Sequence, residues 1–435
     1  MFFSIVKQIG FPLSGNINIM EPMEKSFEEL KSYILSHTED MVELEALLTA
    51  IPALAPENGG DGEFEKAAAL EKWLCAHGIT DISRYDAPDE RVSSKCRPNM
   101  VAKIPGADDG APDSYCIWVC AHLDVVPVGE KSLWNTDPWT LVEKDGKIYG
   151  RGVEDNQQGL VSGILAALAF VATGTLPAHT IKLLFMADEE VGSKYGMNYL
   201  LEKHRELFGK SDRILIPDGG DSAGATIEIA EKNILWPRFH TIGKQSHGSR
   251  PDLGRNACLA AADLALRINS LEQTFNGRNE LFDPPTSTFQ PTMKLQNVEG
   301  VNMIPGDDVL YADCRINPDY PLSEVRTEIK KHVEAVEQKY GVKIEVSEVQ
   351  AEESKATPKD APVVRELAAA IKAVHGIDAK TVGIGGGTVA AGLRNLGFDA
   401  VVWSTLDETC HQPNEYAIVE NISKDALTVA YMASA

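Results

Sequence analysis

The chain has 435 residues, of which 43% are hydrophobic and 24% charged, and its formal net charge is −23. This length exceeds what one hydrophobic core usually supports, so we expect two domains. The acidic excess argues against a nucleic-acid partner, which requires clustered Lys and Arg, and no apolar run approaches the ~18 residues of a membrane span.

The cysteines and the N-terminal residues indicate the cellular compartment in which the protein is expected. The seven cysteines include no Cys-x-x-Cys pair, so a disulfide framework or a cysteine-based zinc site is not expected and a cytoplasmic location fits best. Residues 1–23 lack the continuous apolar core of a signal peptide. We interpret them as a loose N-terminal extension, with Met20 or Met23 as the expected start of the protein.

The first half of the chain alternates apolar segments of helix and strand length. Helical spacing of apolar residues predicts helices over 24–36, 41–48, 62–78 and 155–171. Short β-branched or aromatic runs predict strands over 100–104, 115–120, 180–187 and 213–217. This alternation indicates an α/β fold with a mostly parallel sheet and helices on both faces, in which chemistry lies beyond the carboxyl ends of the strands.

The pattern changes near residue 235. Strands are expected over 236–243, 292–298, 308–316 and 342–349, and helices over 256–271 and 322–338. This order of elements is typical of a ferredoxin-like α+β domain. A helix over 360–375 and a strand over 400–404 resume the helix and strand alternation of the first half of the chain. We therefore expect a catalytic domain in two parts, 24–234 and 353–435, with an inserted domain over 235–352.

His122 and Asp124 follow the strand predicted over 115–120. In extended chain two residues apart, both side chains point to the same side. The pair suits a metal-binding histidine and the carboxylate that fixes its tautomer and orientation. Standing alone, such a pair is more often structural, because buried histidines are commonly just hydrogen-bonded.

More acids and a second histidine lie at comparable places. Asp155 follows a glycine-rich turn and is either a functional carboxylate or a plain helix cap. Glu189 and Glu190 follow the third predicted strand, and they would repel each other unless a cation or a shared proton intervened. Asp218 follows the fourth strand. His411 follows the strand over 400–404, and alone it would be interpreted as a surface histidine.

Two histidines and several carboxylates at strand ends indicate a metal site. Zn²⁺ binds histidine nitrogen and carboxylate oxygen, whereas Mg²⁺ and Ca²⁺ use few histidines. The candidate ligands outnumber those of one tetrahedral zinc site, which suggests two metals that share a bridging carboxylate.

The succession of these motifs resembles the dizinc amidohydrolase and exopeptidase superfamily, which includes carnosinase-like dipeptidases, carboxypeptidase G, aminoacylase, acetylornithine deacetylase and succinyl-diaminopimelate desuccinylase. The resemblance runs from about residue 25 to the end. It is carried by motifs in the order His122-x-Asp124, Gly150-Arg151-Gly152 to Asp155, Glu189-Glu190, Asp218 and His411. These motifs are specific for the superfamily and only weakly specific for a substrate.

The resemblance implies two zinc ions per subunit, which Co²⁺ or Mn²⁺ can replace. His122 and Asp218 would hold one ion, Glu190 and His411 the other, and Asp155 would bridge them.

Two neighbouring acids receive other roles from the resemblance. Glu189 would be the general base that takes a proton from the attacking water. Asp124 would orient His122.

The inserted domain resembles the family's lid and dimerisation domain, so a homodimer is expected. His247 matches the histidine that stabilises the oxyanion, commonly from the partner subunit. Asn302 and Arg315 match lid positions that contact substrate, and Arg315 would pair with its free carboxylate. Without the resemblance, a loop asparagine and a surface salt bridge are equally good interpretations. Gly387 and Thr388 match a turn whose backbone N–H groups line the substrate pocket.

Two departures from the family pattern concern the substrate and not the metal centre. Asn156 follows Asp155, where many members carry a second acid. Beyond Thr388, where some members carry an arginine, the nearest arginine is the displaced Arg394.

The sequence thus predicts a dizinc metallohydrolase that cleaves an amide bond in a small peptide or N-acyl amino acid with a free carboxylate. An exopeptidase of the dipeptidase or carboxypeptidase type and an N-acyl-amino-acid deacylase of the acetylornithine deacetylase or succinyl-diaminopimelate desuccinylase type both stay open. A dipeptidase should hold the amino group with an acid, whereas a succinyl deacylase should add a cationic contact. The scarcity of arginine after Thr388 favours the exopeptidase. An inactive binding protein on the same scaffold would lack Glu189 or a ligand, and the sequence contains them all.

Overall fold

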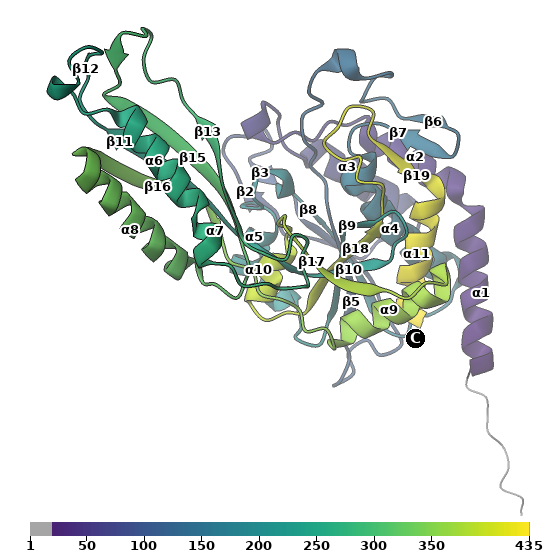
Figure 1. Cartoon of the computed structure of the whole chain (residues 1–435). Helices are drawn as coiled ribbons and strands as arrows, with labels where there is room; N and C mark the ends of the chain where they lie inside the picture. Colours follow the sequence, from purple (N-terminus) through teal and green to yellow (C-terminus); the bar gives the residue numbers. More distant parts are fainter. Residues whose placement is uncertain (1–19, 435) are drawn as a thin grey trace, which may run out of the picture.

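The computed structural model describes residues 20–434, with side chains from residue 26 onward. Two β-sheets organise it, and each forms its own lobe (Figure 1). The extension expected over 1–23 lies outside the described residues as far as residue 19, and helix α1 (Met20–Ser36) already begins at Met20. In the described part of the chain, every helix is too short or too polar to cross a lipid bilayer.

The larger sheet has eight strands in the order β1-β4-β8-β5-β9-β18-β10-β17. Their bounds are β1 (Ile82–Arg84), β4 (Met100–Ile104), β5 (Cys116–His122), β8 (Thr180–Met186), β9 (Arg213–Asp221), β10 (Thr226–Glu231), β17 (Lys380–Ile384) and β18 (Ala400–Thr405). The four central strands β8, β5, β9 and β18 run parallel, and so do β10 and β17. The other three pairings are antiparallel.

Alternate residues of the central strands enter two different cores, because successive side chains of a strand point to opposite faces. In β5, Ile117 and Val119 belong to one core, and Trp118 and Cys120 to the other. The first core packs against α1, α2 (Thr38–Thr49), α3 (Phe64–Ala76), α4 (Gly159–Thr173), α9 (Pro362–His375) and α11 (Val419–Ser434). The second packs against α5 (Met197–Lys203) and α10 (Ala390–Asn395). The predicted α/β class, with helices on both faces, is confirmed.

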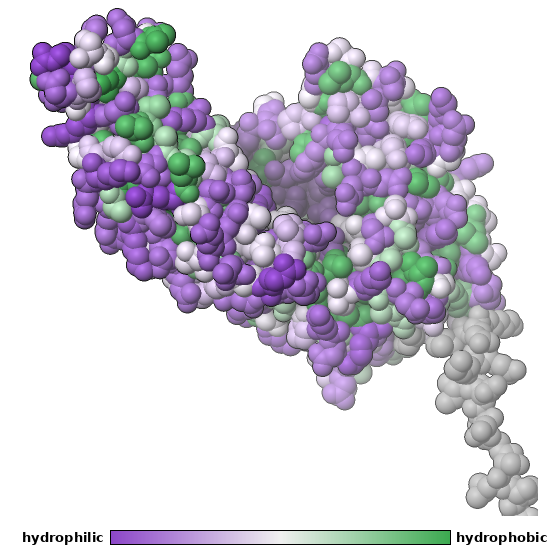
Figure 2. Space-filling view, in the orientation of Figure 1, coloured by the Kyte–Doolittle hydropathy of each residue, from purple (hydrophilic) through white to green (hydrophobic). Residues whose placement is uncertain are grey.

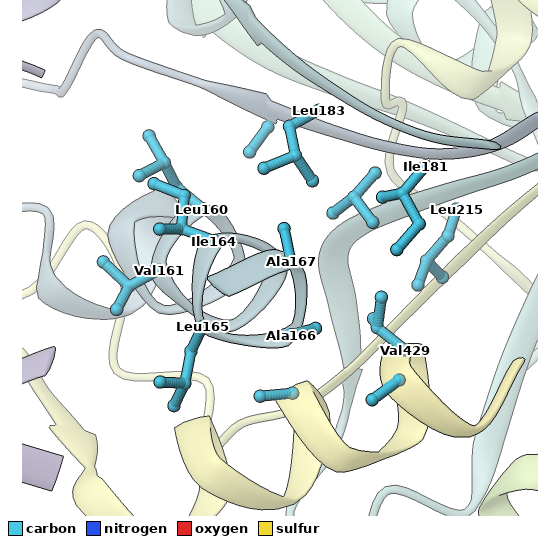
Figure 3. Close-up of a cluster of buried hydrophobic side chains, with 14 of the residues drawn as sticks. Leu160, Val161, Ile164, Leu165, Ala166, Ala167, Ile181, Leu183, Leu215 and Val429 are labelled. Atoms are coloured by element: carbon cyan, nitrogen blue, oxygen red, sulfur yellow. The ribbon is translucent and has the colours of Figure 1, made fainter. Parts of the chain in front are cut away.

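Helix α4 lies between this sheet and α11. Figure 3 shows Leu160 and Ile164 on its side toward the strands, and Leu165 on its side toward α11. Its glycines allow the close approach: a Cβ on Gly163 would lie 2.9 Å from Val119, and one on Gly159 only 2.4 Å from the carbonyl oxygen of Pro217. The start of α4 is thereby held against the end of β9, beside Asp218.

The smaller sheet has four antiparallel strands in the order β13-β15-β11-β16. Its strands are β11 (Asn233–Ile242), β13 (Thr288–Lys294), β15 (Asp307–Ile316) and β16 (Lys343–Glu352), and α6 (Ala257–Asn269) and α8 (Leu322–Tyr340) cover one face. Counted along the chain, the strand order is second, third, first, fourth, which is the ferredoxin-like arrangement that was predicted. On this basis we propose the division into a catalytic domain, 24–234 and 353–435, and an inserted lid domain, 235–352.

Some elements differ from the sequence predictions. The helix expected from residue 155 begins at Gly159, because Asp155 and Asn156 have non-helical φ angles of −117° and −125°. The strand expected over 292–298 lies at Thr288–Lys294, where Phe289 enters the lid core. Strands β1, β10 and β17 and helices α5, α10 and α11 were not predicted.

Candidate metal centre

The carboxylate of Asp155 lies between two histidines. Its Oδ1 is 2.9 Å from Nε2 of His122, and its Oδ2 is 3.1 Å from Nε2 of His411. The Nε2 atom of each histidine meets one further carboxylate, Asp218 at 3.7 Å from His122 and Glu190 at 3.1 Å from His411. The five residues predicted as metal ligands therefore converge, in two halves that share Asp155.

The topology of the large sheet explains this convergence. The neighbouring parallel strands β8, β5, β9 and β18 all end at one edge of the sheet, and each is followed by or ends in a candidate ligand. His122 is the last residue of β5, and Asp218 lies near the end of β9. Glu190 lies in a short turn after β8, and His411 in the loop after β18. Asp155 precedes α4, whose start is held at the same edge.

Asp124 joins two of these strand ends. Its two carboxylate oxygens accept the backbone N–H groups of Glu189 and Glu190, each at 3.0 Å. Its Oδ1 lies 3.4 Å and its carbonyl oxygen 3.0 Å from Nδ1 of His122. Because Nδ1 faces Asp124, Nε2 is left to face Asp155 and Asp218.

The site contains more negative than positive charge. Burial, with Asp218 as the next cause, raises the pKa of Glu189 well above its usual range. Burial and Asp155 raise the pKa of Glu190 to about 7, although His411 opposes the rise. Hydrogen bonds to Asp155 and Glu190 raise the pKa of His411 to about 10. The carboxylates are held together against their mutual repulsion, with two histidines as the cations beside them.

The donor set fits divalent metal ions. One oxygen of Glu190, Oε1, is buried without a hydrogen-bond partner. Single donor atoms of His122, Asp155 and Glu190 lie within 4.8 Å of one another, and so do those of His122, Glu189 and Asp218. Imidazole nitrogens combined with carboxylate oxygens are typical ligands of zinc and related transition metals.

Glu415, which sequence analysis did not single out, holds the loop that carries Asp155. Its buried carboxylate accepts backbone N–H groups of Gly152, Glu154 and Asp155 at 3.0, 3.0 and 3.2 Å. It also pairs with Arg151, with 2.5 Å between Nη1 and Oε2.

Glu154 holds the loop that carries His411 in the same way. Its carboxylate accepts the backbone N–H groups of Asp407 and Cys410, each at 2.8 Å, and that of Thr409. Each ligand loop thus contains the acid that binds the backbone of the other loop. An acid beside a predicted ligand in a short loop is the signal that could have identified both residues.

Asn156, one of the departures from the family pattern, also has a structural role here. Its side-chain oxygen accepts the N–H of His122 at 3.2 Å, and its amide donates to Oδ1 of Asp218 at 3.0 Å and to the carbonyl of Pro217 at 2.6 Å. The amide therefore fixes two candidate ligands relative to each other.

A cleft of about 1120 Å³ separates the metal centre from the lid sheet, and Figure 2 shows the surface hollowed between the two lobes. Glu189, Glu190 and His411 line one side. Gly387 and Thr388 line it as well, and the hydroxyl of Thr388 donates to Glu231 at 2.7 Å.

Arg315 lines the cleft from the lid sheet. Its Nε and Nη2 donate to Asp313 at 2.7 and 3.2 Å, and its Nη1 donates to the carbonyl of Gly385 at 2.9 Å. Arg394, the arginine displaced from the family position, is buried and paired with Glu231 at 3.1 Å.

His247 and Asn302 lie away from this cleft within one chain. His247 lies in β12 (Ser246–His247), which pairs with β14 (Met303–Ile304) at the far end of the lid (Figure 1), and Asn302 lies in the turn directly before β14. The exposed ring of His247 contacts the hydroxyl of Ser249 at 2.8 Å, and the carbonyl of Asn302 accepts the N–H of Gly248 at 2.7 Å. The structure thus brings together all the predicted residues except these two.

An α/β fold with an inserted α+β domain and a cluster of histidines and carboxylates at the strand ends defines a metal-dependent hydrolase. A family model described as Peptidase family M20/M25/M40 matches residues 118–435, and the chain belongs to that family.

Comparisons with individual proteins agree with this assignment. An uncharacterized metallohydrolase of Methanocaldococcus jannaschii is 40% identical over 403 residues, which cover 89% of this chain and 97% of that protein. A succinyl-diaminopimelate desuccinylase of Nitratiruptor is 24% identical over 390 residues, covering 88% and 96%. The crystal structure of the aminopeptidase PepT from Bacillus cereus superposes with a TM-score of 0.73 at 19% identity, covering 91% and 98%, and shares the fold. The predicted superfamily and the hydrolytic activity are confirmed.

Proposed function

We propose that the protein is a dizinc exopeptidase, of the dipeptidase or carboxypeptidase type, that cleaves an amide bond in a small substrate with a free carboxylate. One observation carries the proposal: the two oxygens of Asp155 lie at 2.9 and 3.1 Å from two different histidines, and each histidine meets a further carboxylate. This pattern suits two cations that share one carboxylate. Asp155 would bridge them, with His122 and Asp218 on one side and Glu190 and His411 on the other.

The cations, when bound, would supply Lewis acidity that polarises the amide carbonyl and makes an attacking water more acidic. Glu189 lines the cleft beside the ligands, and we assign it the proton transfer. Its carboxylate would accept the proton of the water and deliver it to the leaving amine. Asp124 would keep His122 in the orientation that the reaction needs.

The position of the lid residues favours a homodimer. His247 and Asn302 are exposed at the far end of the lid, where a second subunit can meet them. We propose that His247 reaches the cleft of the partner subunit and donates a hydrogen bond to the oxyanion. Arg315, Gly387 and Thr388 line the cleft of their own chain and would contact the substrate there.

The deacylase remains the second candidate, because the desuccinylase relative matches across 88% of this chain. The test is a hydrolysis screen with metal-replete protein, in which dipeptides are set beside N-acetyl and N-succinyl amino acids. Release from dipeptides alone supports the exopeptidase. Release from acylated amino acids alone makes the protein a deacylase, and metal binding without any turnover would favour the inactive binding protein. A cytoplasmic location remains a prediction.

A further inference from the structure

The face of the lid sheet that borders the cleft carries opposite charges at its two ends. In the strand register, Ile234 of β11 is paired with Arg315 of β15 on one side and with Glu352 of β16 on the other. Directly opposed residues of antiparallel strands project from the same face, and all three line the cleft. A row of guanidinium, apolar side chain and carboxylate therefore crosses the sheet.

The neighbouring row fixes the cationic end. The indole N–H of Trp236 donates to Oδ1 of Asp313 at 3.0 Å, and Asp313 also binds Arg315. The bonds that Arg315 donates to Asp313 and to the carbonyl of Gly385 occupy one N–H on each of its three guanidinium nitrogens. A guanidinium has five N–H groups, so Nη1 and Nη2 each retain one further donor. Arg315 is held in place and can still bind a carboxylate.

The acidic end has no such partner. Glu352 is half-buried, and no Lys, Arg or His among residues 26–434 forms an ion pair with it. Burial raises its pKa above the usual range, and a hydrogen bond from Gln350 opposes this only in part. By contrast, the nearby Glu231 is paired with Arg394.

We propose that the cleft binds a short zwitterionic peptide along this row, with Glu352 accepting the free α-ammonium group while Arg315 binds the terminal carboxylate. The inference rests on the proposed function and deepens it, because it assigns the substrate class to peptides with an unblocked amino terminus.

The dimensions suit this assignment. Two strand spacings of about 4.8 Å place the backbones at Arg315 and Glu352 about 10 Å apart. An extended dipeptide spans at most about 7 Å, and a charge-assisted hydrogen bond of about 2.8 Å at each end brings the required separation of the two charged groups to about 12–13 Å. The two side chains would therefore have to diverge by about 2–3 Å from the spacing of their backbones. In a peptide bound in this way, the scissile amide would lie between the two charged ends, in the cleft that Glu189 and His411 also line.

The same row discriminates against the alternative substrates. An N-succinyl amino acid would bring its second carboxylate toward Glu352, where like charges repel each other. An N-acetyl group would leave Glu352 without a cation. A succinyl deacylase would need a cation at this position, and the row provides one only at Arg315.

The test measures binding separately from turnover. Metal-loaded Glu189→Gln protein is titrated by calorimetry with a panel of dipeptides and with their desamino counterparts, in which hydrogen replaces the ammonium group. We expect dipeptides to bind at least about tenfold more tightly, as for a hydrogen bond between charged groups. Adding Glu352→Gln should abolish this preference. Adding Glu345→Gln should preserve it, because Glu345 lies on the same strand but pairs with Lys343 outside the cleft.

Each result has a definite meaning. The proposal is overturned if the desamino compounds bind as tightly as the dipeptides, if no member of the panel binds, or if the preference survives Glu352→Gln. Wild-type protein assayed with the same compounds tests the proposed function independently. A preference for the ammonium group in binding, combined with no hydrolysis of any amide, would refute the exopeptidase and leave the Glu352 subsite standing.

Discussion

Replacing Asp124 with Asn tests whether this residue builds the metal centre. The carboxylate oxygens accept one N–H each from Glu189 and Glu190, at 3.0 Å, and Oδ1 faces Nδ1 of His122 at 3.4 Å. An asparagine keeps only one acceptor oxygen, and its NH₂ group would face a backbone donor. One charged hydrogen bond is therefore lost, worth about 1.5–3 kcal/mol.

If that energy is lost from metal binding, the affinity falls about 10- to 100-fold, since about 1.4 kcal/mol corresponds to a factor of ten. Residues that orient metal ligands typically have effects of this size. The assay is a competition titration of the metal with a chromophoric chelator at neutral pH.

A matched control separates this effect from general destabilisation. Asp212 is also a buried carboxylate bound to β5, accepting the N–H of Cys116 at 2.9 Å and the indole N–H of Trp118 at 2.7 Å, but at the opposite end of the strand from His122. Asp212→Asn should weaken folding and leave metal affinity unchanged. If Asp124→Asn binds metal as tightly as the wild type, or if Asp212→Asn loses as much affinity, Asp124 has no specific role in building the metal centre.

Three further predictions concern the base, the lid and a buried lysine. Glu189→Gln should retain metal and lose about 10²- to 10⁴-fold in kcat, and near-normal turnover would remove Glu189 from the proton transfer. His247→Ala should lower kcat with metal content intact, and mixing it with Glu189→Gln should restore some activity; no recovery would argue for a site built within one chain. Burial lowers the pKa of Lys66 from 10.5 to about 8 in the folded protein. Between pH 8 and pH 10.5 the unfolded chain therefore binds more protons at this lysine than the folded protein does. The free energy of unfolding should rise with pH across this range, by at most about 1.4 kcal/mol per pH unit. Urea denaturation of Lys66→Met should show a smaller rise across this window, and an unchanged slope would contradict the assignment.

Four of the five metal ligands were predictable in position, because each follows a short apolar run that indicates a buried strand. Asp155 follows a glycine-rich turn instead and was assigned through the resemblance. The ends of parallel strands meet at one edge of a sheet, so residues such as His122 and Asp218 come together without any knowledge of loop conformation. The ferredoxin-like order of the lid followed from apolar periodicity in the same way.

Other parts of the site were not predictable, because their partners are backbone groups or distant in sequence. Glu415 binds N–H groups of residues 152–155, and Glu154 those of 407–410. The position of each acid beside a predicted ligand marks it as a candidate, but the sequence does not show which distant backbone it binds. The row from Arg315 to Glu352 depends on the strand register of the lid, which a motif search does not give.

The hydrogen bonds by which Glu154 and Glu415 join the Asp155 loop to the His411 loop have a consequence for biosynthesis. The two loops that bind each other are separated by most of the chain, and the second one lies close to the C-terminus. During translation, the Asp155 loop therefore lacks its partner until Glu415 has also been synthesised. A growing chain that ends before residue 415 does not have the contacts that join the two loops. We therefore expect both metal ions to be bound in this arrangement only after residues 407–415 have been made.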